Sequence, residues 1–278
     1  MPVRIPVPGC ARTVCGMTLN SKNAIIYGAG GGIGSAVATT FAAQGARVFL
    51  VGRTQERLEA VADGITAAGG RAEVAVFDAL DENAVDEHAR SVAEQAGGID
   101  VSFNLISGGD LQGIPLADMT TADFTRPVLT RLTANFVTAR AAARHMVKQG
   151  SGVILALDSG SAHGSPMMGG TGPADAATDT LVRNLAAELG PQGVRVVGIW
   201  TAGLPETLSP EKIAAHSGAP KMDDAAFQGL VQQLDGMRMT RRSPRLEQVA
   251  ATAAFLASDA AGAITGTFVN VTSGMFPS

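Results

Sequence analysis

The sequence holds very few of the side chains that build disulfide frameworks or supply phenol groups. Its 278 residues include two cysteines, one tyrosine and one tryptophan. Both cysteines, Cys10 and Cys15, fall within the first sixteen residues, so no disulfide framework can hold the body of the chain together. We interpret them as incidental thiols of a cytoplasmic protein. Tyr27 is the only phenol available for acid–base chemistry, and no lysine occurs between Lys148 and Lys212.

Charge and long apolar runs are also scarce. Charged residues make up 17% of the chain and the formal net charge is −4, so there is no basic excess for nucleic acid or for an anionic membrane. No apolar run approaches the roughly 18 residues of a membrane-spanning helix. Prolines interrupt residues 1–16, which excludes a signal-peptide core. We expect a flexible extension over residues 1–20 and a single domain over residues 21–278.

Short, almost wholly apolar runs alternate with longer segments of helical period. The runs predict strands over residues 24–27, 47–51, 72–77, 100–104, 152–157, 194–199 and 267–271. The segments between them predict helices over residues 32–44, 54–68, 81–96, 122–148, 173–189 and 246–257. Strands that are apolar on both sides belong to a parallel sheet that is covered on both faces. The pattern therefore predicts an α/β fold: a Rossmann-like, doubly wound, seven-stranded parallel sheet with helices on both faces.

One long stretch, residues 201–243, interrupts this alternation after the sixth strand. It leaves the sheet at a carboxyl end, where ligands bind in open α/β sheets. Two interpretations stay open at this point: a lid over a pocket, or a plain surface excursion.

A glycine-rich string, YGAGGGIG at residues 27–34, follows the first predicted strand and opens the first helix. Glycine lets the backbone turn tightly and approach a pyrophosphate, while the helix N-terminus offers free N–H groups and the positive end of its dipole. In this strand–turn–helix context the string is a specific signal of dinucleotide binding. We expect cofactor contacts from Gly28, Gly30, Gly32, Ile33 and Gly34.

The end of the second predicted strand indicates which dinucleotide is bound. Gly52 and Arg53 stand where an acid would bind the ribose hydroxyls of NAD. Without that acid a 2′-phosphate meets no repulsion, and Arg53 could pair with it. We therefore expect NADP(H) in preference to NAD(H). The alternative is that Arg53 is an ordinary solvated loop residue.

Together these segments resemble the short-chain dehydrogenase/reductase family, of the single-domain type that includes many 3-oxoacyl reductases. The resemblance extends from about residue 21 to residue 274 and is closest over residues 185–196 and 249–274. It implies further cofactor contacts from Asp78 and Ala79 after the third strand and from Asn104 after the fourth. It also implies a homo-oligomer, a dimer or tetramer built on the two long helices at about 122–148 and 173–189.

The sequence departs from this family at the catalytic positions. The family uses Asn, Ser, Tyr and Lys, and the matching positions here are Arg131, Ser159, Thr171 and Asp175. A phenol beside an ammonium can exchange a proton with a substrate oxygen, whereas a threonine hydroxyl is a far poorer acid. The resemblance therefore implies an oxidoreductase whose usual proton donor is missing. We expect Arg131 either to bind an anionic substrate group or to neutralise Asp158 or Asp175.

Asp175 also has an ordinary structural interpretation. With Gly172 as the N-cap, Pro173 takes the first helical position and Asp175 the third, where an acid is favoured by the helix dipole. On the sequence alone, this capping role is preferred to a catalytic one.

Candidates for a substitute site follow the fifth strand. His163 titrates near neutrality and could protonate an alkoxide, while Ser159 polarises a carbonyl; equally, His163 could be an exposed loop residue. No metal site is expected. Three functions stay open: an NADP(H)-dependent oxidoreductase with a remodelled site that acts on a small carbonyl or hydroxyl substrate, a catalytically silent nucleotide-binding or partner-binding homologue, and a non-redox enzyme on the same fold.

Overall fold

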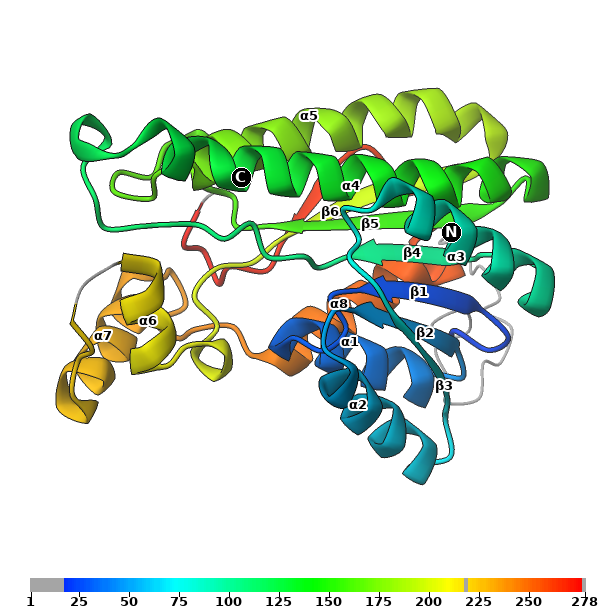
Figure 1. Ribbon diagram of the computed structural model, residues 1–278, viewed down its shortest axis with the longest axis horizontal. Helices are drawn as coiled ribbons and strands as arrows, with labels where there is room; N and C mark the ends of the chain where they lie inside the picture. The colour runs from blue at the N-terminus through cyan, green and yellow to red at the C-terminus, as the bar shows by residue number, and fades with distance from the viewer. Residues whose placement is uncertain (1–17, 218–219, 277–278) are drawn as a thin grey trace, which may run out of the picture.

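A computed structural model describes residues 18–217 and 220–276 as one parallel sheet with helices around it (Figure 1). The seven strands lie in the order β3-β2-β1-β4-β5-β6-β7. They are β1 (Asn23–Tyr27), β2 (Arg47–Gly52), β3 (Arg71–Val76), β4 (Val101–Asn104), β5 (Gly152–Asp158), β6 (Val194–Trp200) and β7 (Phe268–Asn270). Every strand pair is parallel, which confirms the predicted fold class.

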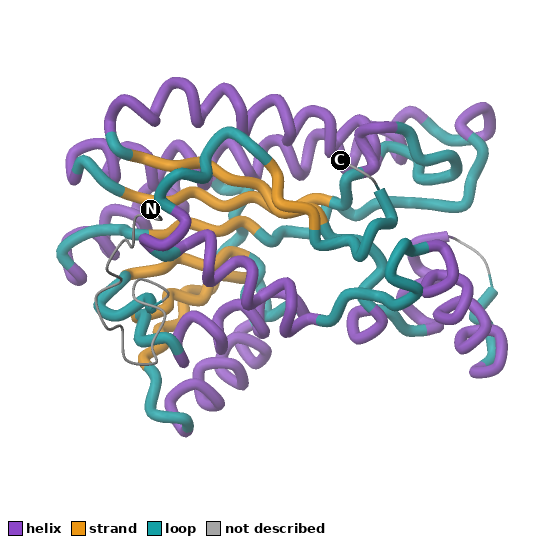
Figure 2. Tube along the Cα trace, turned by 180° about the vertical axis from the view of Figure 1, so that it is seen from behind, coloured by secondary structure: helices purple, strands orange, loops and turns teal. Residues whose placement is uncertain are grey.

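The helices form one layer on each face of the sheet (Figures 1 and 2). One layer holds α1 (Gly32–Ala43), α2 (Gln55–Ala67) and α8 (Leu246–Ala257); the other holds α3 (Glu82–Ala96), α4 (Thr121–Gln149) and α5 (Thr171–Leu189). Alternate strand residues serve the two layers: Ile26 packs in the core beneath α1 and α8, and Ile25 in the core beneath α3 and α4. Burial on both faces is the reason that the strands are apolar throughout.

The first described residues fall within the predicted N-terminal extension. Residues 1–17 of the predicted extension lie outside the described residues. Leu19, however, is fully buried in the core beneath α1, and its N–H donates to the Gln44 carbonyl at 3.0 Å. Leu19, which the sequence assigns to the extension, therefore packs as part of the core.

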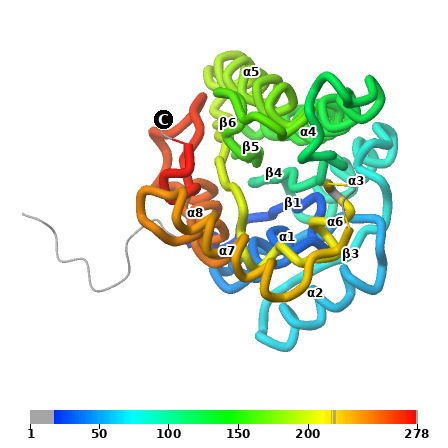
Figure 3. The backbone as a smooth tube through the Cα atoms, turned by 90° about the vertical axis from the view of Figure 1, so that its left-hand side faces the viewer, coloured from blue at the N-terminus to red at the C-terminus, as the bar shows by residue number. Residues whose placement is uncertain are grey.

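The long stretch after β6 forms a helical arm at the carboxyl ends of the strands (Figures 1 and 3). The arm contains α6 (Pro210–Ser217) and α7 (Asp224–Met237), with a short 3-10 segment, Pro205–Thr207, before them. No residue of α7 is fully buried, and four of its large apolar side chains are half-buried: Phe227, Leu230, Val231 and Leu234. Among the described residues, no helix has the length and apolar character that a membrane span requires.

Candidate functional site

The glycine string forms a tight turn between β1 and α1 that leaves no room for side chains. Gly28 has a φ of +79°, and a Cβ added there would lie 2.7 Å from the Leu105 carbonyl oxygen. A Cβ at Gly34 would lie 2.2 Å from the carbonyl oxygen of Gly28. Gly31 caps α1 without any side-chain hydrogen bond, so the amides of the first turn face the glycine turn. This cradle fits the pyrophosphate of a dinucleotide.

Arg53 and Asp78 mark the far end of the expected dinucleotide site. The two form an ion pair at 3.7 Å, with side chains 78% and 43% exposed. Asp78 also accepts the Leu80 N–H at 3.0 Å, and Ala79 is buried behind it. Because an exposed ion pair at this distance is weak, the guanidinium remains free to take another anion.

Asn104, at the end of β4, belongs to a buried polar chain that crosses from the sheet to α5. Its Nδ2 donates to Asn135 Oδ1 at 2.8 Å, and Asn135 Nδ2 donates to Thr178 Oγ1 at 3.4 Å. Asn135, on α4, was not predicted as a site residue. The only sign of it in the sequence was an amide on a helical face that is rich in alanine.

The predicted catalytic positions Arg131 and Asp175 meet in a buried ion pair. Arg131 Nη1 donates to Asp175 Oδ1, and its Nη2 donates to Asp110 Oδ2, both at 2.7 Å. Asp175 is completely buried and Asp110 nearly so. The prediction that Arg131 neutralises a nearby carboxylate is confirmed for Asp175. Asp110, in the loop after β4, was missed because nothing local marks it.

Asp175 does not cap its helix, so that interpretation was wrong. The helix α5 begins at Thr171 after Gly170, which places Asp175 in its second turn. From there Asp175 Oδ2 accepts three hydrogen bonds from the loop after β5: from Ser159 N at 3.2 Å, Ser159 Oγ at 2.5 Å and Ser161 N at 2.9 Å. The Asp175 carboxylate therefore organises this loop through tertiary contacts.

Thr171 is also buried, with 1% of its surface exposed. Its hydroxyl donates to Asp110 Oδ1 at 2.9 Å. Asp110 thus joins Thr171 to Arg131, and the three matched positions 131, 171 and 175 form one network. Ser159, the fourth matched position, is only half-buried and borders this network.

A second buried carboxyl lies beneath the loop. Asp158 Oδ1 accepts the Gly160 N–H at 3.0 Å, while its Oδ2 is buried with no hydrogen-bond partner among the described residues. Burial and the charge of Asp175 raise the pKa of Asp158 to about 9. Burial raises the pKa of Asp175 too, but Arg131 and the loop donors oppose that effect. Near neutral pH Asp158 therefore holds its proton, while the Asp175 carboxyl faces the Arg131 guanidinium.

His163 lies to one side of this network. Its exposed ring packs edge-on against Trp200, with ring centroids 5.3 Å apart. Trp200 in turn donates its indole N–H to Asp179 Oδ1 at 3.3 Å. The His163 ring forms no hydrogen bond with any residue that the structure describes. The structure therefore places His163 near the end of β6, beside Ser159 in sequence but outside the ion network.

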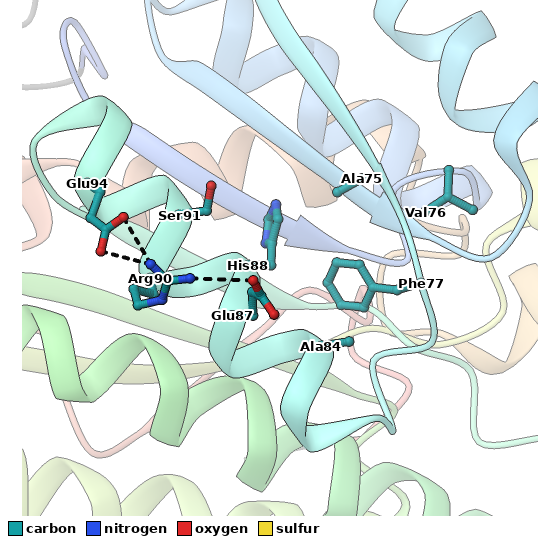
Figure 4. A pocket seen from close by; sticks show the side chains of 9 residues that line it. All are labelled: Ala75, Val76, Phe77, Ala84, Glu87, His88, Arg90, Ser91 and Glu94. Atoms are coloured by element: carbon teal, nitrogen blue, oxygen red, sulfur yellow. Dashed lines mark hydrogen bonds and ion pairs between the residues drawn. The ribbon is translucent and has the colours of Figure 1, made fainter.

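A separate groove lies between the last residues of β3 and the helix α3 (Figure 4). It is lined by Ala75, Val76, Phe77, Ala84, Glu87, His88, Arg90, Ser91 and Glu94. His88 is packed against Phe77 with ring centroids 5.3 Å apart, and burial lowers the pKa of His88 to about 4. None of these nine residues belongs to the predicted site.

Comparison with known proteins identifies the family. The family model described as enoyl-(acyl carrier protein) reductase matches residues 28–276. The 7alpha-hydroxysteroid dehydrogenase of Escherichia coli (strain K12) is 31% identical over 264 residues, which cover 93% of this chain and 95% of the relative. Gluconate 5-dehydrogenase of Gluconobacter oxydans is 27% identical, with coverage of 93% and 96%. The chain belongs to the short-chain dehydrogenase/reductase family.

Solved structures agree with this assignment. A 7 alpha-hydroxysteroid dehydrogenase complexed with NADH and 7-oxo glycochenodeoxycholic acid matches with a TM-score of 0.79 and 30% identity, covering 93% of this chain and 95% of that one. An NAD+-bound xylitol dehydrogenase matches with a TM-score of 0.81 and 27% identity, covering 92% and 99%.

Proposed function

We propose that this protein binds NADP(H) at the glycine turn and acts as an oxidoreductase on a small carbonyl or hydroxyl substrate, without a tyrosine–lysine pair. The observation that carries the proposal is the buried network around Asp175, at positions that the family resemblance matches to catalytic residues. When bound, the dinucleotide supplies hydride-transfer chemistry. Relatives named as dehydrogenases support the oxidoreductase assignment.

The choice of NADP(H) rests on Arg53. Its guanidinium is largely exposed at the end of β2, next to Gly52, which offers no carboxylate to a ribose. A 2′-phosphate there would form charge-assisted hydrogen bonds that are stronger than the loose contact with Asp78. NAD(H) lacks this phosphate and would gain nothing from Arg53.

The network leaves few groups that could donate a proton to the substrate oxygen. The Thr171 hydroxyl is committed to Asp110, and Asp175 is sealed from solvent. Ser159 is half-buried, but its hydroxyl lies 2.5 Å from Asp175 Oδ2. A substrate oxygen would have to compete with this charge-assisted bond for the Ser159 proton. We therefore expect slow carbonyl reduction.

The same observation favours a second candidate function, a nucleotide-binding protein without turnover. Arg131, Thr171 and Asp175 all form hydrogen bonds with one another or with Asp110 inside the protein. Residues that act on a substrate usually keep a polar atom available to it. The second candidate predicts normal dinucleotide binding and no reduction of any carbonyl.

Binding titrations with NADPH and NADH, followed by a panel of ketones and aldehydes, test the proposal. We expect NADPH to bind more tightly, and turnover on the order of 10² to 10⁴ below that of the E. coli relative run as a matched reference. Failure to bind either dinucleotide would refute the cofactor assignment. If the wild type turns over at the reference rate and neither Ser159→Ala nor His163→Ala slows it, the active site is elsewhere. If His163→Ala alone slows turnover, the His163 imidazole is the acid that protonates the substrate.

A further inference from the structure

Arg238, at the end of α7, is the largest fully buried side chain among the described residues. Only 1% of its surface is exposed. No carboxylate in the described part of the chain forms an ion pair with it. Burying a guanidinium that no ion pair compensates is costly: burial lowers the pKa of Arg238, and the charge of Asp235 opposes this effect only in part. Such a costly arrangement calls for an explanation in terms of what the side chain holds.

The two terminal nitrogens of the guanidinium donate to three backbone carbonyl oxygens, while its Nε is buried with no hydrogen-bond partner among the described residues. Nη1 donates to the Leu234 carbonyl at 2.6 Å, which fixes Arg238 to its own helix. Nη2 donates to the carbonyls of Ala202 at 2.7 Å and Gly203 at 3.1 Å. The planar guanidinium thus joins α7 to the loop that follows β6, a geometry that the single ammonium of lysine cannot reproduce.

The loop is shaped around this side chain. Gly203 has a φ of +56°, and a Cβ added there would lie 2.9 Å from Arg238 Nη2. Beyond Gly203 the same segment reaches the glycine turn, where Thr207 Cγ2 lies 3.2 Å from the position of a Cβ on Gly32. A continuous run of contacts therefore connects α7, through Arg238 and residues 202–207, to the start of α1.

We propose that Arg238 is a positioning residue that holds residues 202–207 against the dinucleotide-binding turn and so couples the α6–α7 arm to cofactor binding. The proposal rests on the proposed function for its cofactor part alone, because the link between Arg238 and the loop exists without any ligand. Loss of the guanidinium should loosen residues 202–207 and weaken NADPH binding, although Arg238 lies outside the glycine turn.

Hydrogen exchange of the full-length protein, with and without NADPH, tests this link. We expect Arg238→Lys to speed amide exchange in residues 202–207 and in α7, to leave β1, β4 and β5 unchanged, and to weaken NADPH binding by about tenfold. Gly203→Ala attacks the same contact from the loop side and should produce the same pattern. Arg242→Gln, an exposed arginine of the same segment, is the matched control and should change neither quantity.

Two outcomes would overturn the inference. One is unchanged exchange in residues 202–207 for both Arg238→Lys and Gly203→Ala. The other is faster exchange throughout the sheet in both variants, which would mean that Arg238 stabilises the fold as a whole and positions nothing in particular. If the wild type binds no dinucleotide, the proposed function fails, while the exchange pattern of the free protein still decides whether Arg238 holds the loop.

Discussion

Replacing Asp158 with asparagine should change how the stability of this protein depends on pH. The pKa of Asp158 is raised from 3.8 to about 9 by burial and by the neighbouring charge of Asp175. Between about pH 4 and pH 9 the unfolded chain has therefore released this proton while the folded protein still holds it. The contribution of Asp158 to stability thus falls as the pH rises through this window, by up to about 1.4 kcal/mol for each pH unit. Asparagine keeps the shape of the neutral acid and removes the titration.

We expect the free energy of unfolding of Asp158→Asn to gain steadily on the wild type from pH 5 to pH 8. Urea unfolding at each pH measures this difference, with the emission of the buried, single Trp200 as the probe. Burial lowers the pKa of His88 from 6.5 to about 4, so the folded protein becomes less stable as the pH falls below 6.5. This effect is the same in the wild type and in Asp158→Asn, and it therefore cancels in the difference between them. Asp118→Asn, at an exposed carboxylate, is the control. Parallel pH profiles for Asp158→Asn and wild type would refute the raised pKa of Asp158.

Three further outcomes are expected. Arg53→Ala should weaken NADPH binding by roughly tenfold or more and leave NADH binding unchanged; equal affinities for the two dinucleotides in the wild type would contradict the role of Arg53. The combined substitution Arg131→Asn, Thr171→Tyr and Asp175→Lys should raise ketone reduction by on the order of 10² or more, and no gain in a variant that still binds NADPH would count against the matched positions. Sedimentation velocity at micromolar concentration should show a dimer or tetramer. Leu129 lies on the exposed face of α4, and Leu129→Glu should dissociate this oligomer; a monomeric wild type would exclude an oligomer built on α4.

The sheet was predictable because its signal is local. Every predicted strand agrees with the structure within one residue at each end, since the apolar runs that mark the strands are bounded by polar and glycine residues. The glycine turn was equally clear, because the steric requirement at Gly28 and Gly34 is visible in the residue types themselves. What could not be predicted was the contact between a loop and a distant helix that brings Asp110 to Arg131.

Asp175 shows where local rules fail. Its position after a proline satisfied the rules for a helix start, yet α5 begins two residues earlier than predicted and directs Asp175 toward the loop after β5. The pattern of buried positions along the whole helix indicates the role of Asp175 better than its position near the helix start does. Thr171, Thr178 and Val182 share the buried face of α5 with Asp175. A carboxylate on the buried stripe of a helix requires a cation, and the sequence did offer Arg131 for that role.

The electrostatics of the network explain why positions 131, 171 and 175 depend on one another. A lysine at 175 would favour the ionised form of a phenol at 171, because a positive charge stabilises a phenolate. In this chain the anion at 175 is balanced by Arg131, which Asp110 also binds, so the site offers no net positive charge to a hydroxyl. Lysine at 175 alone would face Arg131 across a buried 2.7 Å contact, and asparagine at 131 alone would leave Asp175 buried without its cation. Each single reversion is therefore expected to destabilise the fold before it changes the chemistry, so the proton-transfer site can be rebuilt only by changing these residues together.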